Sequence, residues 1–156
     1  MKVLVACECS GRVRDAFRLL GHNAWSCDLK PSETPSDHHI EGNVLEHLNE
    51  GWDLMIAHPT CTFMCRNRAR LNKIEEKEID SSLFMSLLNA NIDKICVENP
   101  VPSKMAKLPK YDQIIQPYQF GHGETKATCL WLKNLPMLVP TKIVSGREHK
   151  IHLMKP

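Results

Sequence analysis

Five short apolar runs recur along the chain, and each one ends near a polar or turn-forming residue. They occupy residues 3–7, 23–29, 52–59, 94–100 and 128–135, with the sequences VLVAC, NAWSCDL, WDLMIAHP, KICVENP and TCLWLKNL. Runs of this length that are rich in branched or aromatic residues and bounded by glycine or proline predict buried strands. Helical patterns separate several of them, so the sequence predicts an α/β fold with a mainly parallel sheet.

The spacing of apolar residues predicts two helices. Val13, Phe17 and Leu20 recur at helical spacing, and Gly21 then suits the end of a helix. Between residues 75 and 91, one face of a second helix is marked by Ile79, Leu83, Phe84, Leu87 and Leu88. Prolines, serines and a threonine predict a loop over residues 30–39. The length of 156 residues suits one domain, which we expect to span residues 1–138, with a weakly periodic C-terminal tail at 139–156.

The overall composition excludes few classes of function. The net charge of +2 neither requires nor excludes a nucleic-acid partner. No apolar run approaches the ~20 residues of a membrane span, and the N-terminal segment reaches charged residues too early for a signal peptide. We therefore expect a cytoplasmic protein with no membrane partner, whose seven cysteines stay reduced.

Groups that could take part in chemistry lie where four of the predicted strands end. In chain order these groups are Cys9, Ser10 and Gly11, then Asp28, then Pro59 and Cys61, then Glu98 and Asn99. In an open parallel sheet, ligands bind in the crevice beyond the carboxyl ends of the strands. Asp28 could accept both ribose hydroxyls of a nucleoside-containing cofactor, or it could be an acid on a solvated loop. Gly11 could belong to a cofactor-binding turn, or it could simply permit a tight turn.

Cys61 and Glu98 each have a structural and a functional interpretation. Most cysteines are inert core residues, but Cys61 lies past a strand end, where nearby cations would favour the nucleophilic thiolate. Those cations are Arg66, Arg68 and Arg70, which either contact phosphates from one side of an extended loop or belong to a solvated segment. Glu98 follows an apolar run, where a carboxylate needs a partner; that partner could be structural, or Glu98 could be a catalytic acid.

The order of these motifs resembles that of the catalytic domain of DNA cytosine-C5 methyltransferases. The chain resembles even more closely a group of short, phage-borne proteins described as cytosine-methyltransferase-like. The family's glycine-rich turn, its Pro-Pro-Cys and its Glu-Asn-Val have counterparts here in CSGRV, HPTCT and VENP. Its acids after the second and third strands correspond to Asp28 and to EGN at 41–43, and the first arginine of a later motif corresponds to Lys126. The resemblance covers residues 1 to about 133.

The resemblance implies a Rossmann-like, doubly wound fold and transfer of a methyl group from S-adenosylmethionine to carbon 5 of a cytosine. Cys61 would add to carbon 6 of the ring, and Glu98 would hydrogen-bond N3 and the exocyclic amine. Asn99 would hold the loop that carries Cys61, and Lys126 would add a cation near the base or a phosphate. The cofactor would be bound by Cys9, Ser10, Gly11, Asp28, Asn43 and Pro59.

The same resemblance bears on the partners of the chain. The substrate would be a pyrimidine in DNA or in a nucleotide. Its phosphates would be bound by Arg66, Arg68 and Arg70. The family's target-recognition domain has no counterpart in these residues. We therefore expect a partner protein or a second copy of the chain to supply target recognition, and a preference for single strands or nucleotides, which need no base flipping.

Two other interpretations stay open. The chain could bind nucleic acid or a nucleotide without turnover, as a non-catalytic module derived from this fold. Alternatively, the thiols of Cys7, Cys9, Cys61 and Cys65 could meet at neighbouring strand ends, with His58 close by, and four sulfurs suit zinc or an iron–sulfur centre. Because the spacings of these cysteines match no recognised ligand pattern, we predict no metal site.

Overall fold

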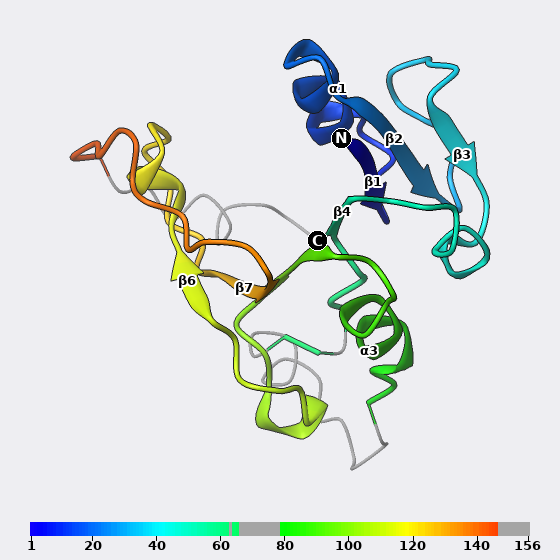
Figure 1. Ribbon diagram of the computed structural model, residues 1–156. Helices are drawn as coiled ribbons and strands as arrows, with labels where there is room; N and C mark the ends of the chain where they lie inside the picture. The colour runs from blue at the N-terminus through cyan, green and yellow to red at the C-terminus, as the bar shows by residue number, and fades with distance from the viewer. Residues whose placement is uncertain (63, 66–78, 147–156) are drawn as a thin grey trace.

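Parallel strands build the larger part of the fold. The computed structural model describes residues 1–62, 64–65 and 79–146. Within them the chain forms a single α/β domain around one seven-stranded sheet (Figure 1). The strands that pair in parallel are β1 (Lys2–Ala6), β2 (Asn23–Asp28), β3 (His39–Glu41), β4 (Leu54–Ala57) and β5 (Lys94–Pro100). The predicted α/β class is therefore confirmed.

The last two strands make the sheet a mixed one. β7 (Thr128–Lys133) pairs antiparallel with both β5 and β6 (Gln113–Ile115), so the order across the sheet is β3-β2-β1-β4-β5-β7-β6. The sheet is mainly parallel, as the sequence predicts. The two strands that the apolar runs do not predict, β3 and β6, have three residues each, too few to show an alternating pattern. β3 begins at His39, inside the predicted loop.

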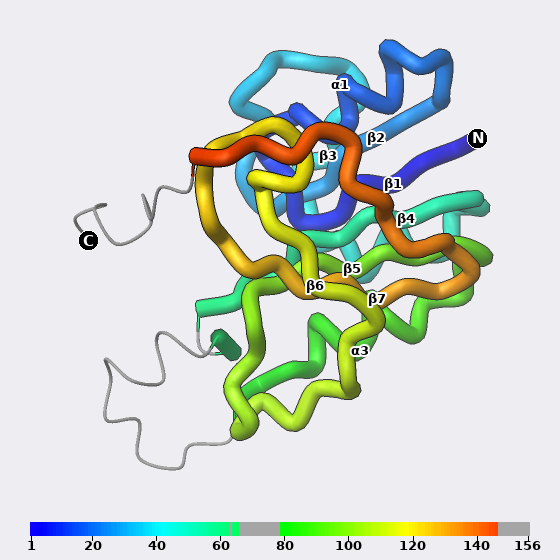
Figure 2. Tube along the Cα trace, turned by 90° about the vertical axis from the view of Figure 1, so that its left-hand side faces the viewer, coloured from blue at the N-terminus to red at the C-terminus, as the bar shows by residue number. Residues whose placement is uncertain are grey.

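The two α-helices pack on opposite faces of the sheet. α1 (Arg12–Leu19) joins β1 to β2 and lays Val13 and Phe17 on one face. Gly21, just beyond the end of α1, has a φ of 80°, as expected for a glycine that terminates a helix. α3 (Ser82–Leu88) precedes β5 and buries Phe84 and Leu87 on the other face. Figure 2 shows the strands between these two helices. Three short 3-10 helices complete the described part of the chain: η1 (Val44–Glu46), η2 (Lys104–Ala106) and η3 (Pro117–Gln119).

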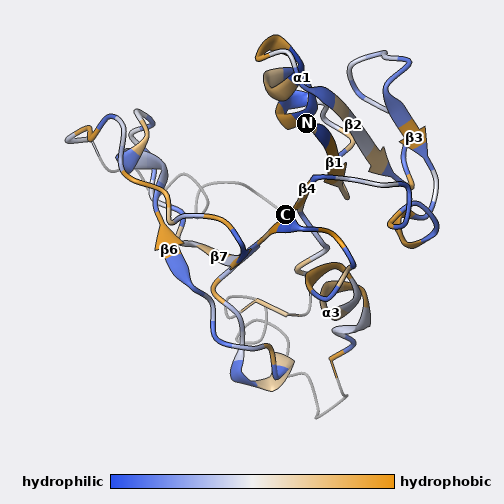
Figure 3. Ribbon diagram, viewed as in Figure 1, coloured by the Kyte–Doolittle hydropathy of each residue, from blue (hydrophilic) through white to orange (hydrophobic). Residues whose placement is uncertain are grey.

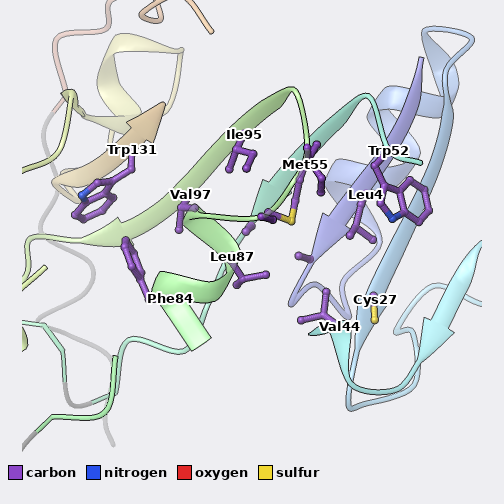
Figure 4. Close-up of a cluster of buried hydrophobic side chains, with 14 of the residues drawn as sticks. Leu4, Cys27, Val44, Trp52, Met55, Phe84, Leu87, Ile95, Val97 and Trp131 are labelled. Atoms are coloured by element: carbon purple, nitrogen blue, oxygen red, sulfur yellow. The ribbon is translucent and has the colours of Figure 1, made fainter. Parts of the chain in front are cut away.

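The alternation of side chains along the strands divides the apolar residues between two cores. Leu4 and Ala6 of β1 belong to the larger core under α3, whereas Val3 and Val5 belong to the smaller core under α1. The larger core extends from β2 to β7 (Figure 4). At one end of it, the rings of Phe84 and Trp131 meet edge to face, with their centroids 4.8 Å apart. This core fixes the strand ends that carry the candidate site.

The second helix is shorter than its apolar pattern predicts. The helix expected over residues 75–91 is observed at Ser82–Leu88, and residues 79–81 are not helical. Residues 66–78 lie outside the described part of the chain. Asp80 Oδ1 accepts a hydrogen bond from the Ser82 amide at 2.8 Å, and the hydrogen bonds from Ser82 lower the pKa of Asp80. A carboxylate that satisfies the first free amide of a helix explains why α3 begins there.

Candidate functional site

The register of the parallel strands brings several predicted site residues to one edge of the sheet. Ala57 at the end of β4 pairs with Val97 of β5, so the next residues along the two strands, His58 and Glu98, are neighbours. β1 lies between β4 and β2, and β2 ends at Asp28 on the same edge. The candidate site is therefore the carboxyl edge of the sheet, where open α/β sheets bind ligands.

A buried amide holds the loop that carries Cys61. Asn99 is only 2% exposed, and its Nδ2 donates a hydrogen bond to the carbonyl oxygen of Pro59 at 3.0 Å. Beyond Pro59, the amides of Met64 and Cys65 both donate to the carbonyl of Cys61, so the chain turns back at this residue. Asn99 thus ties the loop to β5, which is the contact that the resemblance implies for it.

Glu98 has a partner that the sequence analysis did not assign. Its Oε2 lies 3.2 Å from Nδ1 of His58, and the two side chains are 23% and 30% exposed. The second ring nitrogen of His58, Nε2, is buried and has no hydrogen-bond partner, the one such side-chain atom found in the described residues. A buried polar atom without a partner is costly, so Nε2 of His58 is available for a hydrogen bond to a water molecule or a ligand. One feature of the sequence could have indicated a role for His58: it stands directly before Pro59 at the end of a predicted strand.

The pKa of Cys61 is raised, which corrects the expectation that cations would favour its thiolate. Burial of this half-buried thiol is the main cause, and the nearby groups of Cys65 and Glu98 act in the same direction. A backbone hydrogen bond and the Lys126 ammonium lower the pKa but do not outweigh burial. Strand pairing places the three predicted residues in the same region: Cys61 follows β4, Glu98 lies on the neighbouring β5, and Lys126 precedes Thr128, which pairs with Pro100 of β5. The predicted phosphate contacts lie outside the described residues: Arg66, Arg68 and Arg70.

The turn at Gly11 is filled by the protein's own side chains. Gly11 has a φ of 72°, and a Cβ at this position would come within 2.4 Å of Nη2 of Arg14. Glu8 is only 6% exposed and accepts hydrogen bonds from the amides of Val13 and Arg14, at 2.8 and 3.3 Å, and from the Ser10 hydroxyl at 2.9 Å. Glu8 therefore occupies the amino end of α1. Ser10 and Gly11, which are predicted as cofactor residues, therefore have structural roles at the amino end of α1.

Arg14 is a second residue that the sequence analysis missed. It is fully buried, and its guanidinium donates to Ser26 Oγ at 3.0 Å, to Ser32 Oγ at 3.1 Å and to the Thr34 carbonyl at 3.3 Å. Its Nε also lies 2.8 Å from the Asp15 carboxylate, and this bond lowers the pKa of Asp15. Arg14 thus joins α1 to β2 and to the loop that follows β2.

That loop covers part of the predicted cofactor turn. The amide of Glu33 donates to the carbonyl of Cys9 at 2.8 Å, and the hydroxyl of Thr34 donates to the carbonyl of Ser10 at 3.2 Å. The carbonyl of Pro59 is already bonded to Asn99. The backbone acceptors of Cys9, Ser10 and Pro59 are therefore engaged within the protein.

Asp28 and Asn43 keep groups that fit a nucleoside. Asp28 Oδ1 accepts a hydrogen bond from the Lys30 amide at 3.0 Å, and a carboxylate can accept several more from a pair of hydroxyls. Asn43 Oδ1 accepts from the Leu45 amide at 3.1 Å and caps η1, while its side-chain amide remains a donor. These two side chains therefore keep hydrogen-bonding groups near the carboxyl ends of β2 and β3, whereas the turn at Gly11 is filled by Arg14 and Glu8.

Within the part of the chain that the structure describes, no group of three or more histidine, cysteine, aspartate or glutamate side chains has the arrangement needed to hold a metal ion. β1 and β4 are neighbours, as the four-thiol interpretation requires. Burial raises the pKa of the Cys7 thiol to about 12.

The free energy of unfolding should fall above pH 9 because buried thiols resist ionisation. Cys27 is fully buried, and burial raises its pKa from 9.0 to about 11. The folded state keeps this proton at pH values where the unfolded thiol loses it. The contribution to stability is therefore present below pH 9 and lost as the pH rises towards 11, with a slope of about 1.4 kcal/mol per pH unit. Urea unfolding of the wild type and of Cys27→Ala between pH 8 and 11 measures the difference in slope. Parallel slopes would contradict the prediction.

Comparison with known proteins does not assign this chain to a family. No family model matches this chain. A search of curated proteins also finds no match. Within the part of the chain that the structure describes, no helix combines the length and the apolar character that crossing a membrane requires. The case for a function therefore rests on the geometry of the carboxyl edge of the sheet.

Proposed function

We propose that this chain is a cytosine-C5-methyltransferase-like enzyme, which transfers a methyl group from S-adenosylmethionine to a pyrimidine. The observation that carries the proposal is that strand pairing gathers a thiol, a carboxylate and a cation at one edge of the sheet. Cys61 follows β4, Glu98 lies on the neighbouring β5, and Lys126 precedes Thr128, which pairs with Pro100 of β5. Methylation at carbon 5 needs a nucleophile, an acid at N3 and a positive group near the developing charge, which is the same set.

Each residue of the site has a defined part in the proposed reaction. Cys61 must first lose its proton, since burial favours the neutral thiol, and its sulfur then forms a bond to carbon 6 of the ring. The electron pair of the broken double bond moves to carbon 5, and Glu98 stabilises the charged ring through N3. Carbon 5 would use this pair to form its bond to the methyl group, with the thioether S-adenosylhomocysteine as the leaving group. Loss of the carbon-5 proton to solvent water, which would also take the proton of Cys61, then expels the Cys61 thiolate and restores the double bond. S-adenosylmethionine supplies the methyl group, and Asp28 and Asn43 are the residues that would hold its nucleoside.

His58 positions Glu98 in this scheme. Its Nδ1 engages Oε2 of Glu98 at 3.2 Å, which restricts the rotation of the carboxylate and leaves Oε1 for the pyrimidine. The amide of His58 donates to the carbonyl of Ala6 at 2.9 Å, so the histidine is itself fixed to the neighbouring strand. A positioned acid stabilises the transition state more than a mobile acid does, because it need not reorganise when charge develops on the ring.

A trapping experiment tests the proposal directly. An oligonucleotide that contains 5-fluorocytosine should form a stable adduct with Cys61 in the presence of S-adenosylmethionine, because fluorine cannot leave in place of the carbon-5 proton. We expect a band of increased mass on denaturing gels that maps to Cys61, and no band for Cys61→Ser, which has nearly the same volume. If neither single-stranded DNA, duplex DNA nor nucleotide forms an adduct, while Cys61→Ser binds them as the wild type does, the chain is a non-catalytic binding module.

A further inference from the structure

We infer that Gln116 is a positioning residue of the candidate site, which holds Lys126 where its ammonium group makes Cys61 more reactive as a nucleophile. The inference concerns the connection between β6 and β7, residues 116–127, which is defined here as the Lys126 loop. It rests on the proposed function only in taking Cys61 as the nucleophile. The reactivity of this thiol can be measured without a pyrimidine, so the inference is tested apart from the proposed chemistry.

The Lys126 loop begins and ends at the edge of the sheet that carries the candidate site. β6 ends at Ile115 and β7 begins at Thr128, and these two residues pair with each other. Thr128 also pairs with Pro100 of β5, two residues beyond Glu98. Antiparallel neighbours are commonly joined by about two to five residues, so a connection of this length is a candidate for a function of its own.

Polar contacts give the Lys126 loop its shape. Figure 3 shows mainly hydrophilic positions between β6 and β7. The amide of Gln116 donates a hydrogen bond to Oε1 of Gln119 at 2.7 Å, and the side chain of Gln116 accepts one from the amide of Gln119 in return. The two glutamines therefore fix each other's side chains at the start of the loop.

The side chain of Gln116 also holds the backbone of Lys126. Its Oε1 accepts a hydrogen bond from the amide of Lys126 at 2.9 Å. The carbonyl of Lys126 accepts another from the hydroxyl of Thr128 at 3.2 Å, and Thr128 is only 9% exposed. The peptide groups on both sides of Lys126 are thus held, so its exposed side chain extends from a fixed point beside the site.

The C-terminal stretch supports the same loop. The amides of Lys142 and Val144 donate to the carbonyls of Gln119 and Tyr118, at 3.1 and 3.0 Å. Figure 2 shows this stretch, in orange and red, running beside the yellow of the loop. The first part of the loop is therefore bonded to its neighbours, and Gln116 is the residue that joins this part to Lys126.

The charge of Lys126 opposes the effect of burial on Cys61. Burial is the largest cause of the raised pKa of this thiol, and Cys65 and Glu98 act in the same direction, whereas the Lys126 ammonium lowers the pKa. Glu98 is itself engaged by His58. Since a cation favours the thiolate and the thiolate is the nucleophile, Cys61 should react more slowly when Lys126 is displaced.

The pH profile of Cys61 alkylation tests the inference. The rate of labelling by iodoacetamide is followed at Cys61 by mass spectrometry of its peptide over a range of pH. We expect Gln116→Leu to slow labelling at neutral pH about two- to fivefold, the scale of losing one partly screened charge, and to move the profile to higher pH. Lys126→Met should act alike, and the double variant should do no more than Lys126→Met alone. Thr128→Val, which removes only the second hold on Lys126, should move the profile in the same direction.

Gln113→Leu is the matched control. Gln113 lies at the other end of β6, where its side chain makes two hydrogen bonds with the backbone of Leu138, at 2.7 and 2.8 Å. Its replacement therefore removes similar contacts from the same strand, but away from Lys126. The profile of Cys61 should stay that of the wild type, and thermal unfolding shows which variants are folded.

The outcomes separate this inference from the proposed function. Equal profiles for Gln116→Leu and Gln113→Leu, an unchanged profile in Lys126→Met, or additive effects in the double variant would each overturn the inference. If Gln116→Leu does not fold, the profile of Thr128→Val decides in the same way. Shifted profiles would support the inference even when the wild type forms no 5-fluorocytosine adduct, a result that would overturn only the proposed chemistry.

Discussion

Replacing Glu98 by glutamine should slow formation of the Cys61 adduct about 100- to 1,000-fold, the usual cost of removing one group that stabilises charge in a transition state. Glutamine keeps the size of the side chain and can still accept a hydrogen bond from His58. It cannot be charged or donate a proton as a carboxylic acid does. A single-turnover experiment with a 5-fluorocytosine strand measures the rate of adduct formation, and binding of the strand should change little.

His58→Ala provides the matched control for Glu98→Gln. Because His58 acts through Glu98, loss of His58 should lower the rate of adduct formation less than loss of the acid itself does. It should have almost no further effect when Glu98 is already glutamine, so the two changes should not add. Adduct formation at the wild-type rate in Glu98→Gln would show that Glu98 is only the structural partner of His58.

Arg14→Ala should lower the free energy of unfolding by about 2–4 kcal/mol, because it removes hydrogen bonds from a charged donor and leaves a cavity. Arg14 is fully buried and bonds Ser26, Ser32 and the Thr34 carbonyl, so its loss separates α1 from β2 and from the loop beyond. Urea unfolding followed by circular dichroism measures the change.

Arg12→Ala serves as the control for Arg14→Ala, since Arg12 lies on the same helix and is exposed. Its replacement should change the free energy of unfolding by less than about 0.5 kcal/mol. Gly11→Ala should destabilise as well, because its Cβ would collide with Arg14 Nη2. In the Arg14→Ala background that collision is absent, and only the cost of the positive φ remains. Equal stability of Arg14→Ala and Arg12→Ala would contradict the role given to Arg14.

The amino-acid sequence by itself determined which of the longer strands form and where the candidate site lies. Short apolar runs bounded by turn residues are local signals, and they predicted β1, β2, β4, β5 and β7. Parallel strands must place their carboxyl ends on one edge, so the order of the residues along the chain was enough to assign Asp28, Cys61 and Glu98 to a common site. The bond from Asn99 to the loop also agrees with the motif order. β3 and β6 were missed because three residues in a strand show no pattern.

Only the tertiary structure decided what these groups contact. His58 and Glu98 are 40 residues apart in the chain, and the register of β4 and β5 makes them partners. The same holds for Gly11, whose missing Cβ makes room for the buried guanidinium of Arg14, and for Cys61, whose pKa rises because the thiol is half-buried. Burial and pairing depend on which distant segments become neighbours, and a local pattern of residues does not contain that information.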